Sequence, residues 1–130
     1  MIFLDSSFLI SLIIDKETRH IKSVELLDSL TDYKVINNIV LSETLNGIHR
    51  CDKRKSLEEI YNILIDTAEV VYITSKDYSE AININKYYNN AINYSDCLIL
   101  KTMQDKKITK IVSYDKGFDK IKGINRIYLE

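Results

Sequence analysis

The stretch "MIFLDSSFLISLII" (residues 1–14) joins two different hydrophobic patterns through one aspartate. Residues 1–4 form an unbroken apolar run, which is typical of a short strand buried on both faces, as in a parallel sheet. From residue 6 onward the apolar residues have helical spacing, and Ser6 or Ser7 is a natural N-cap. The sequence therefore predicts a strand that leads directly into a helix, with Asp5 at the junction, where its carboxylate could also cap the helix.

The same alternation of strand and helix continues along the chain. We expect further strands at residues 33–37, 69–73, 110–113 and 124–129, and further helices at residues 18–30, 37–50, 56–66, 75–91 and 94–106. Short apolar strands that alternate with helices predict a three-layer α/β/α sandwich around a mostly parallel, Rossmann-like sheet. Ligands of such sheets bind at the carboxyl ends of the strands, so the residues that follow each strand are the candidates for function.

Composition limits the possible classes of protein. The chain has 130 residues, no proline and three glycines, which predicts a single domain over residues 1–130. Its net charge of -1 gives no overall attraction to nucleic acid or to an anionic membrane. Cys51 and Cys97 lie far apart and are expected to be free thiols. Because the apolar runs are too short to span a bilayer and no signal peptide is evident, we expect no membrane association and a cytoplasmic location.

Acidic residues stand near the ends of several predicted strands. Asp5 follows the first strand and Asp115 follows the fourth. Glu43 lies one to two turns into the helix after the second strand, and Asp96 lies at the start of the helix that leads to the fourth. Asp119, four residues after Asp115, is a possible fifth member. The topology therefore predicts that these acids meet at one edge of the sheet.

Each acid also has a purely structural interpretation. Asp5 could cap its helix, Asp96 could favour the helix dipole, Glu43 could be an exposed helix residue, and Asp115 could belong to a turn. Asp96, however, shares the apolar face of its helix with Ile99, so its carboxylate should point inward. Burying a carboxylate there requires a cap, a cationic partner or a metal ion.

Several carboxylates at one site repel one another unless a cation lies among them. Oxygen-only ligands suit Mg²⁺ or Mn²⁺, as one or two ions, and Mg²⁺ is often shared with a substrate phosphate. The predicted reaction is metal-assisted hydrolysis of a phosphate ester. Ser113, two residues before Asp115, could support the site by binding a metal-bound water or a phosphate, or could merely satisfy the backbone at the strand end.

Four segments, "FLDSSFLIS", "VLSETLNGI", "NYSDCLILKTM" and "KIVSYDKGFDKI", resemble in order and spacing the acidic motifs of the PIN-domain family, and especially its small VapC-type toxins. The resemblance extends over essentially the whole chain and implies a PIN-like fold. It implies that Asp5, Glu43 and Asp96 form the acidic core of a metal site. Asp115 would be the fourth catalytic and metal-binding acid, and Asp119 would match a more variable fifth position. Ser113 occupies a position where threonine is more usual in the family.

The resemblance also implies an activity and partners. The activity would be Mg²⁺- or Mn²⁺-dependent endoribonuclease cleavage of structured RNA such as tRNA or rRNA. The partners would be a second copy of the chain, as a homodimer, and a cognate antitoxin that obstructs the acidic pocket. An RNA substrate needs a positive rim, for which Lys53, Arg54, Lys116 and Lys120 are candidates. Housekeeping RNA processing and a non-catalytic binding module remain as alternatives.

Two other classes of protein, a phosphatase and a signalling domain, are disfavoured because this sequence lacks an aspartate that each class requires. A phosphatase of the haloacid dehalogenase type would need a second aspartate two residues after Asp5, where this chain has Ser7. A receiver-type phosphoacceptor domain would need an aspartate at the end of the third strand, where this chain has Thr74 and Ser75. Neither class fits the acids that are present.

Overall fold

The computed structural model describes residues 1–129, and its centre is one parallel sheet. The strands stand in the order β3-β2-β1-β4-β5, and every neighbouring pair is parallel. In the register of the central strand, Phe3 lies opposite both Val35 and Ile111. The bounds of the strands are β1 (Ile2–Leu4), β2 (Lys34–Asn37), β3 (Glu69–Val71), β4 (Lys110–Val112) and β5 (Asn125–Ile127).

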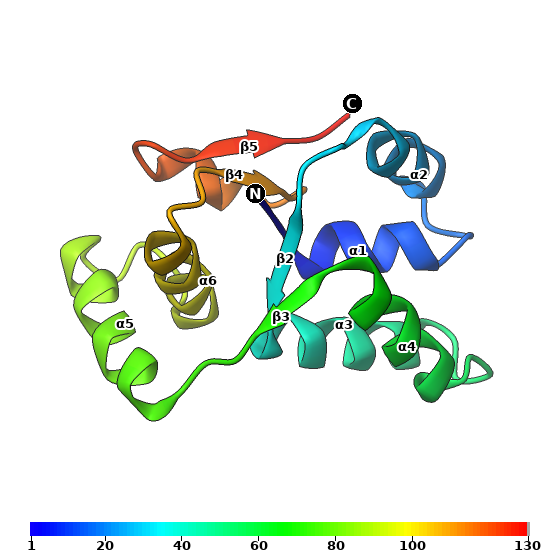
Figure 1. Cartoon of the computed structure of the whole chain (residues 1–130), viewed down its shortest axis with the longest axis horizontal. Coiled ribbons are helices and arrows are strands. Elements are labelled where there is room, and N and C mark those ends of the chain that lie inside the picture. The colour runs from blue at the N-terminus through cyan, green and yellow to red at the C-terminus, as the bar shows by residue number, and fades with distance from the viewer. Residues whose placement is uncertain (130) are drawn as a thin grey trace.

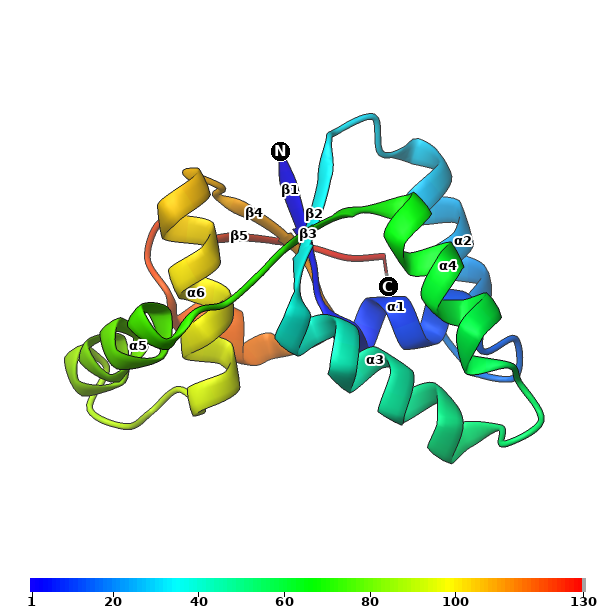
Figure 2. The same cartoon turned by 60° about the horizontal axis from the view of Figure 1, so that its bottom comes forward.

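Helices cover both faces of this sheet (Figures 1 and 2). One side carries α1 (Ser6–Ile13), α2 (His20–Ser29), α3 (Asn38–Cys51) and α4 (Leu57–Thr67). The other side carries α5 (Ser75–Tyr87) and α6 (Tyr94–Lys106), which pack against each other. A short 3₁₀ helix, η1 (Lys116–Lys120), lies between β4 and β5. The predicted three-layer α/β/α sandwich is thus confirmed, and its sheet is parallel throughout.

The hydrophobic core lies where the sheet meets the two helical layers. All three residues of β1 are completely buried, as the apolar run at the N-terminus predicts. Phe8 from α1 and Phe118 from η1 are among the largest fully buried side chains of the core. Burial of such side chains contributes about 2 kcal/mol each, which makes this core the main source of stability.

Helix caps follow the predictions, with one correction. Asn37 caps α3 by accepting a hydrogen bond from the backbone N–H of Val40, and Ser56 caps α4 by accepting one from Glu59. For α1, however, the predicted Ser6 or Ser7 cap is wrong, because Asp5 is the N-cap residue. Asp5 is the residue between β1 and α1, so its carboxylate can accept a hydrogen bond from the first free backbone N–H of the helix, that of Ser6.

Two helix boundaries differ from the predictions by more than one residue. The helix expected at residues 18–30 begins only at His20, and the helix expected at residues 75–91 ends at Tyr87. Asn89 and Asn90 have φ angles of 54° and 62°, in the left-handed region, so they cannot continue an α-helix. Asparagine tolerates this region better than most residues, which explains its use at this turn.

Asn37 also connects the two helical layers near the site. Its side-chain amide donates to Thr102 Oγ1 of α6, 3.1 Å away, while its carbonyl oxygen caps α3. Asn37 and Thr102 are both buried, so this bond fixes α3 and α6 to the same end of β2. The two cysteines are free, as expected, and among residues 1–129 no helix is long and apolar enough to cross a membrane.

Candidate active site at the carboxyl ends of the strands

Asp5 lies at the end of the central strand and is 6% exposed. Its Oδ1 accepts a hydrogen bond from the Ser6 backbone N–H at 2.8 Å. Its Oδ2 accepts from two hydroxyls, Ser113 Oγ at 2.6 Å and Ser7 Oγ at 3.1 Å. Burial raises the pKa of Asp5 above its usual value, and these hydrogen bonds oppose the rise. The strand, the helix N-terminus and two serines therefore hold one carboxylate in a fixed orientation.

Asp96 lies in the first turn of α6, because α6 begins at Tyr94 with Asn93 as its N-cap. Its backbone N–H donates to Asn93 Oδ1, so the cap occupies this N–H and leaves the carboxylate free to face the site. Burial and, in second place, the charges of nearby acids raise the pKa of Asp96 to about 7. Asp96 is half-buried, as expected for a carboxylate on the apolar side of its helix.

The acids that act on Asp96 are Asp5, Asp115 and Glu43, in that order of strength. Asp5 likewise contributes, after burial, to the raised pKa of Glu43. Like charges have such effects only at short range, so the chain does bring these four carboxylates to one edge of the sheet. We call Asp5, Glu43, Asp96 and Asp115 the acidic cluster.

Asp115 and Glu43 are the exposed members of the acidic cluster. Asp115 is the N-cap residue of η1, where its Oδ1 accepts a hydrogen bond from the Gly117 N–H at 2.8 Å. It also lines, with Asp96, a small pocket of about 200 Å³. The turn role expected for Asp115 is therefore real, and it places the carboxylate beside that of Asp96.

No basic side chain neutralises the acidic cluster. Within residues 1–129, none of its four carboxylates forms an ion pair with lysine, arginine or histidine. The donor chemistry, hard oxygens with unbalanced charge, fits a divalent cation such as Mg²⁺. In the same part of the chain, however, no three His, Cys, Asp or Glu side chains are arranged closely enough to hold a metal ion. Binding an ion would require the exposed members to turn inward.

Asp119 has a different environment. Arg126 Nε and Nη2 donate to its two carboxylate oxygens at 2.9 Å and 3.1 Å. This hydrogen-bonded pair lowers the pKa of Asp119. The third donor of Arg126, Nη1, bonds to the carbonyl oxygen of Ser113. The Asp119 carboxylate is thus already occupied by a guanidinium group, unlike the acidic cluster.

Ser7 is a site residue that the sequence analysis did not single out for the site. Its Oγ donates to Asp5 and accepts a hydrogen bond from the backbone N–H of Tyr114 at 3.1 Å. Together with Ser113, it connects the loop after β1 to the loop after β4. The only hint in the sequence is that Ser7 stands two residues after Asp5, in the "DSS" triplet at a helix start. Its hydrogen bond with the backbone N–H of Tyr114 can be found only from the structure.

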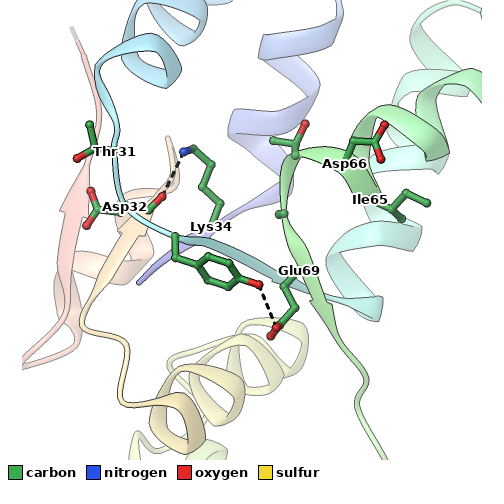
Figure 3. Close-up of a pocket in the computed structure, with 9 residues that line it drawn as sticks. Thr31, Asp32, Lys34, Ile65, Asp66 and Glu69 are labelled. Carbon is green, nitrogen blue, oxygen red and sulfur yellow. Dashed lines mark hydrogen bonds between the residues drawn. The ribbon is translucent and has the colours of Figure 1, made fainter.

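A second hollow, of about 540 Å³, lies at the opposite edge of the sheet, where β2 and β3 begin (Figure 3). Two of its three acids are already paired, since Asp32 contacts Lys110 at 2.7 Å and Glu69 accepts a hydrogen bond from Tyr33 at 3.2 Å. Ligands of parallel sheets bind at the carboxyl ends of the strands, not at this edge. We therefore assign the candidate site to the acidic cluster.

Comparison with known families agrees with this geometry. The family model described as the PIN domain matches residues 2–124, which is nearly the whole chain. The chain belongs to the PIN-domain family. No curated protein sequence matches it significantly.

Solved structures share the fold of this PIN domain at low sequence identity. VapC20 of Mycobacterium tuberculosis, described as a toxin that cleaves the sarcin–ricin loop, is 21% identical, with a TM-score of 0.88 over 99% of this chain and 100% of that one. VapBC2 of Rickettsia felis, bound to a promoter DNA fragment, is 20% identical, with a TM-score of 0.69 over 98% of each chain. A toxin–antitoxin complex of Klebsiella pneumoniae is 19% identical, with a TM-score of 0.73 over 96% of each chain.

Proposed function

We propose that this PIN domain is a Mg²⁺- or Mn²⁺-dependent endoribonuclease whose catalytic and metal-binding residues are the acidic cluster. The observation that supports this most strongly is the approach of four carboxylates to one edge of the sheet, where none of them, within residues 1–129, forms an ion pair with a basic side chain. Burial and the three neighbouring acids raise the pKa of Asp96 to about 7. A site of this kind gains free energy when a divalent cation binds. Asp119 is left out of the proposed ligand set because Arg126 already occupies its carboxylate.

The chain's own residues have distinct roles in this proposal. Asp5 is the fixed ligand, because Ser6, Ser7 and Ser113 hold both of its oxygens. Asp96 is the ligand whose proton must leave before an ion can bind. Glu43 and Asp115 are exposed and can turn toward the ion and the substrate. One or two bound ions would lower the pKa of a coordinated water and offset charge on the phosphoryl oxygens.

The proposed biological role is that of the toxin in a type II toxin–antitoxin pair. The structural neighbours that support it are a VapC toxin that cleaves the sarcin–ricin loop and two toxin–antitoxin assemblies. Structured RNA, tRNA or rRNA, would be the substrate, and a cognate antitoxin would bind the protein. We also propose a homodimer, which the family resemblance implies, and a cytoplasmic location, where a tRNA or rRNA substrate would be present.

The decisive experiment is cleavage of a sarcin–ricin loop RNA, tRNA and total cellular RNA with Mg²⁺, with Mn²⁺ and with EDTA. We expect cleavage with metal that Asp5→Asn and Asp96→Asn abolish while circular dichroism shows an intact fold. Asp66→Asn is the matched control, because Asp66 lies in the hollow at the opposite edge of the sheet (Figure 3). Parent-like cleavage by Asp5→Asn and Asp96→Asn would refute the site.

Induction in a bacterial host tests the toxin role separately from the chemistry. The parent should arrest growth and the Asp96→Asn variant should not. RNA cleavage in vitro without growth arrest would favour the housekeeping role over the toxin role. Absence of cleavage with either metal on every RNA tested would favour a non-catalytic binding module.

A further inference from the structure

A positively charged hollow lies next to the acidic cluster. It has a volume of about 650 Å³ and is formed by the loop before α2, the start of α2, the β4–η1 segment and β5. Four of its side chains are cationic, two are tyrosines and one is a carboxylate, namely Arg19, Lys22, Lys116, Arg126, Tyr114, Tyr128 and Asp119. We call it the basic hollow. It is a local positive surface on a chain whose net charge is -1.

The one carboxylate in the basic hollow, that of Asp119, does not neutralise the positive charge of the hollow. Asp119 is matched by the two hydrogen bonds from Arg126. Within residues 1–129, Arg19, Lys22 and Lys116 form no salt bridge with any acid. Three like charges around one concave surface repel one another and attract an anionic ligand.

One of the two tyrosines in the basic hollow, Tyr114, is held in a fixed orientation. The hydroxyl of Tyr114 lies 2.7 Å from Ser23 Oγ of α2, and Ser23 is completely buried. The guanidinium carbon of Arg19 lies 4.5 Å from the centre of the Tyr114 ring. Stacked arginine and tyrosine groups bind both the phosphates and the bases of single-stranded nucleic acid.

The basic hollow and the acidic cluster share the β4–η1 segment. Tyr114 and Lys116 line the hollow, while Asp115 between them lines the acidic pocket with Asp96. The two hollows are therefore lined by consecutive residues of the chain, and a polyanion bound in the acidic pocket could extend into the basic hollow. The sequence candidates for a positive rim fit only in part, since Lys116 lies here but Arg54 is paired with Asp52 and lines another hollow.

We propose that the basic hollow binds single-stranded nucleotides of the RNA adjacent to the scissile phosphate, which rests on the proposed nuclease function. Phosphates contact Arg19, Lys22 and Lys116, and a base stacks in the region of Tyr114. A fixed aromatic ring beside three cations matches the regular alternation of bases and phosphates in a nucleic acid strand, whereas the acidic side chains of a peptide would contact only the cations. The acidic cluster repels RNA in the absence of metal, so the basic hollow supplies the attraction that brings the strand to it.

The test uses binding and cleavage together. The binding probe is a fluorescein-labelled single-stranded RNA of about ten nucleotides, measured by anisotropy with Mg²⁺ on the Asp96→Asn background, which prevents turnover. The test variant carries Arg19→Gln and Lys22→Gln, two exposed side chains. The matched control carries Lys76→Gln and Lys86→Gln on α5, at the far end of the molecule from α2 (Figure 1). Both double variants remove the same charge.

We expect the Arg19→Gln/Lys22→Gln variant to bind RNA about tenfold more weakly than the control and to lower the salt dependence of log Kd by about 0.7 for each lost contact. In the active background the same pair should raise the KM for RNA more than it changes kcat. Equal affinity and equal salt dependence in the two double variants would overturn the proposal, even if the parent cleaves RNA. If the Arg19→Gln/Lys22→Gln variant binds RNA more weakly than the control while the parent cleaves no RNA, the basic hollow is upheld and the nuclease function is refuted. The two failures are therefore distinguishable.

Discussion

Ser113 Oγ lies 2.6 Å from Asp5 Oδ2 and donates a hydrogen bond to it, although the two residues are at opposite ends of the chain. The same hydroxyl accepts a hydrogen bond from the Asp115 backbone N–H at 2.9 Å. One serine thus fixes the carboxylate after β1 and the backbone that carries the acid after β4. These two hydrogen bonds explain how two loops that are far apart in the sequence hold Asp5 and Asp115 at the same edge of the sheet.

Ser113→Ala tests that arrangement. The substitution removes a hydrogen bond to a buried carboxylate and leaves the Asp115 N–H without its acceptor, so we expect a loss of about 2 kcal/mol in the free energy of unfolding. RNA cleavage should fall as well, because Asp5 loses one of its two hydroxyl partners. Urea unfolding and the cleavage assay measure the two effects. Ser79→Ala, at an exposed position on α5, is the control and should change stability by less than about 0.5 kcal/mol.

The raised pKa of Asp96 predicts an unusual dependence of stability on pH. Burial and neighbouring acids raise it from 3.8 to about 7, so between these values the folded state retains a proton that the unfolded state releases. Stability must then fall as the pH rises through this interval. Asp96→Asn removes the effect, so in metal-free buffer at about pH 8 the variant should be more stable than the parent by about 2 kcal/mol.

Urea unfolding in EDTA at several pH values measures that difference, which should shrink as the pH falls toward about 5. Glu25→Gln, which removes an exposed carboxylate from α2, should show no such pattern. A variant that is less stable than the parent at high pH would mean that the Asp96 carboxylate stabilises the first turn of α6 and is not a repelled acid. Gain of stability with loss of activity is the usual sign of a functional site.

The sequence predicts the sheet well because its strands are short apolar runs and its helices have regular apolar spacing. The position of each acid relative to a strand end is enough to predict that Asp5 and Asp115 approach each other, since parallel strands end at one edge. Asp96 is predictable for a second reason, namely its place on the apolar face of α6. These inferences need only local patterns and one rule of topology.

The remaining features depend on contacts between distant segments, which local patterns do not contain. The pairing of Asp119 with Arg126 joins η1 to β5 and separates this acid from the others. Arg19 reaches Tyr114 across 95 positions of chain, and the resulting hollow has no signature in either segment. The end of α5 differs from the prediction because a polar helix end and a turn of asparagines have similar composition.

Metal binding should stabilise the folded protein in a pH-dependent way. An ion that binds only the folded state at about one hundred times its Kd adds about 2.7 kcal/mol and raises Tm. Protons compete with the ion for Asp96, so the rise in Tm with Mn²⁺ or Mg²⁺ should be larger at pH 8 than at pH 6, values on either side of its pKa of about 7. Asp5→Asn and Asp96→Asn should abolish the rise, whereas Asp66→Asn should retain it. An equal rise in all four proteins would indicate non-specific ion binding.

Asp115 and Asp119 are four residues apart, and the structure assigns them different partners. Asp115 faces the acidic pocket with Asp96, whereas Asp119 receives two hydrogen bonds from Arg126. We therefore expect Asp115→Asn to reduce the metal-dependent rise in Tm and RNA cleavage, and Asp119→Asn to leave the metal-dependent rise unchanged. Differential scanning calorimetry with and without Mn²⁺ compares the two variants, each of which loses one charge. The opposite result would require Arg126 to release Asp119 to the ion, and it would return Asp119 to the ligand set that the family resemblance implies.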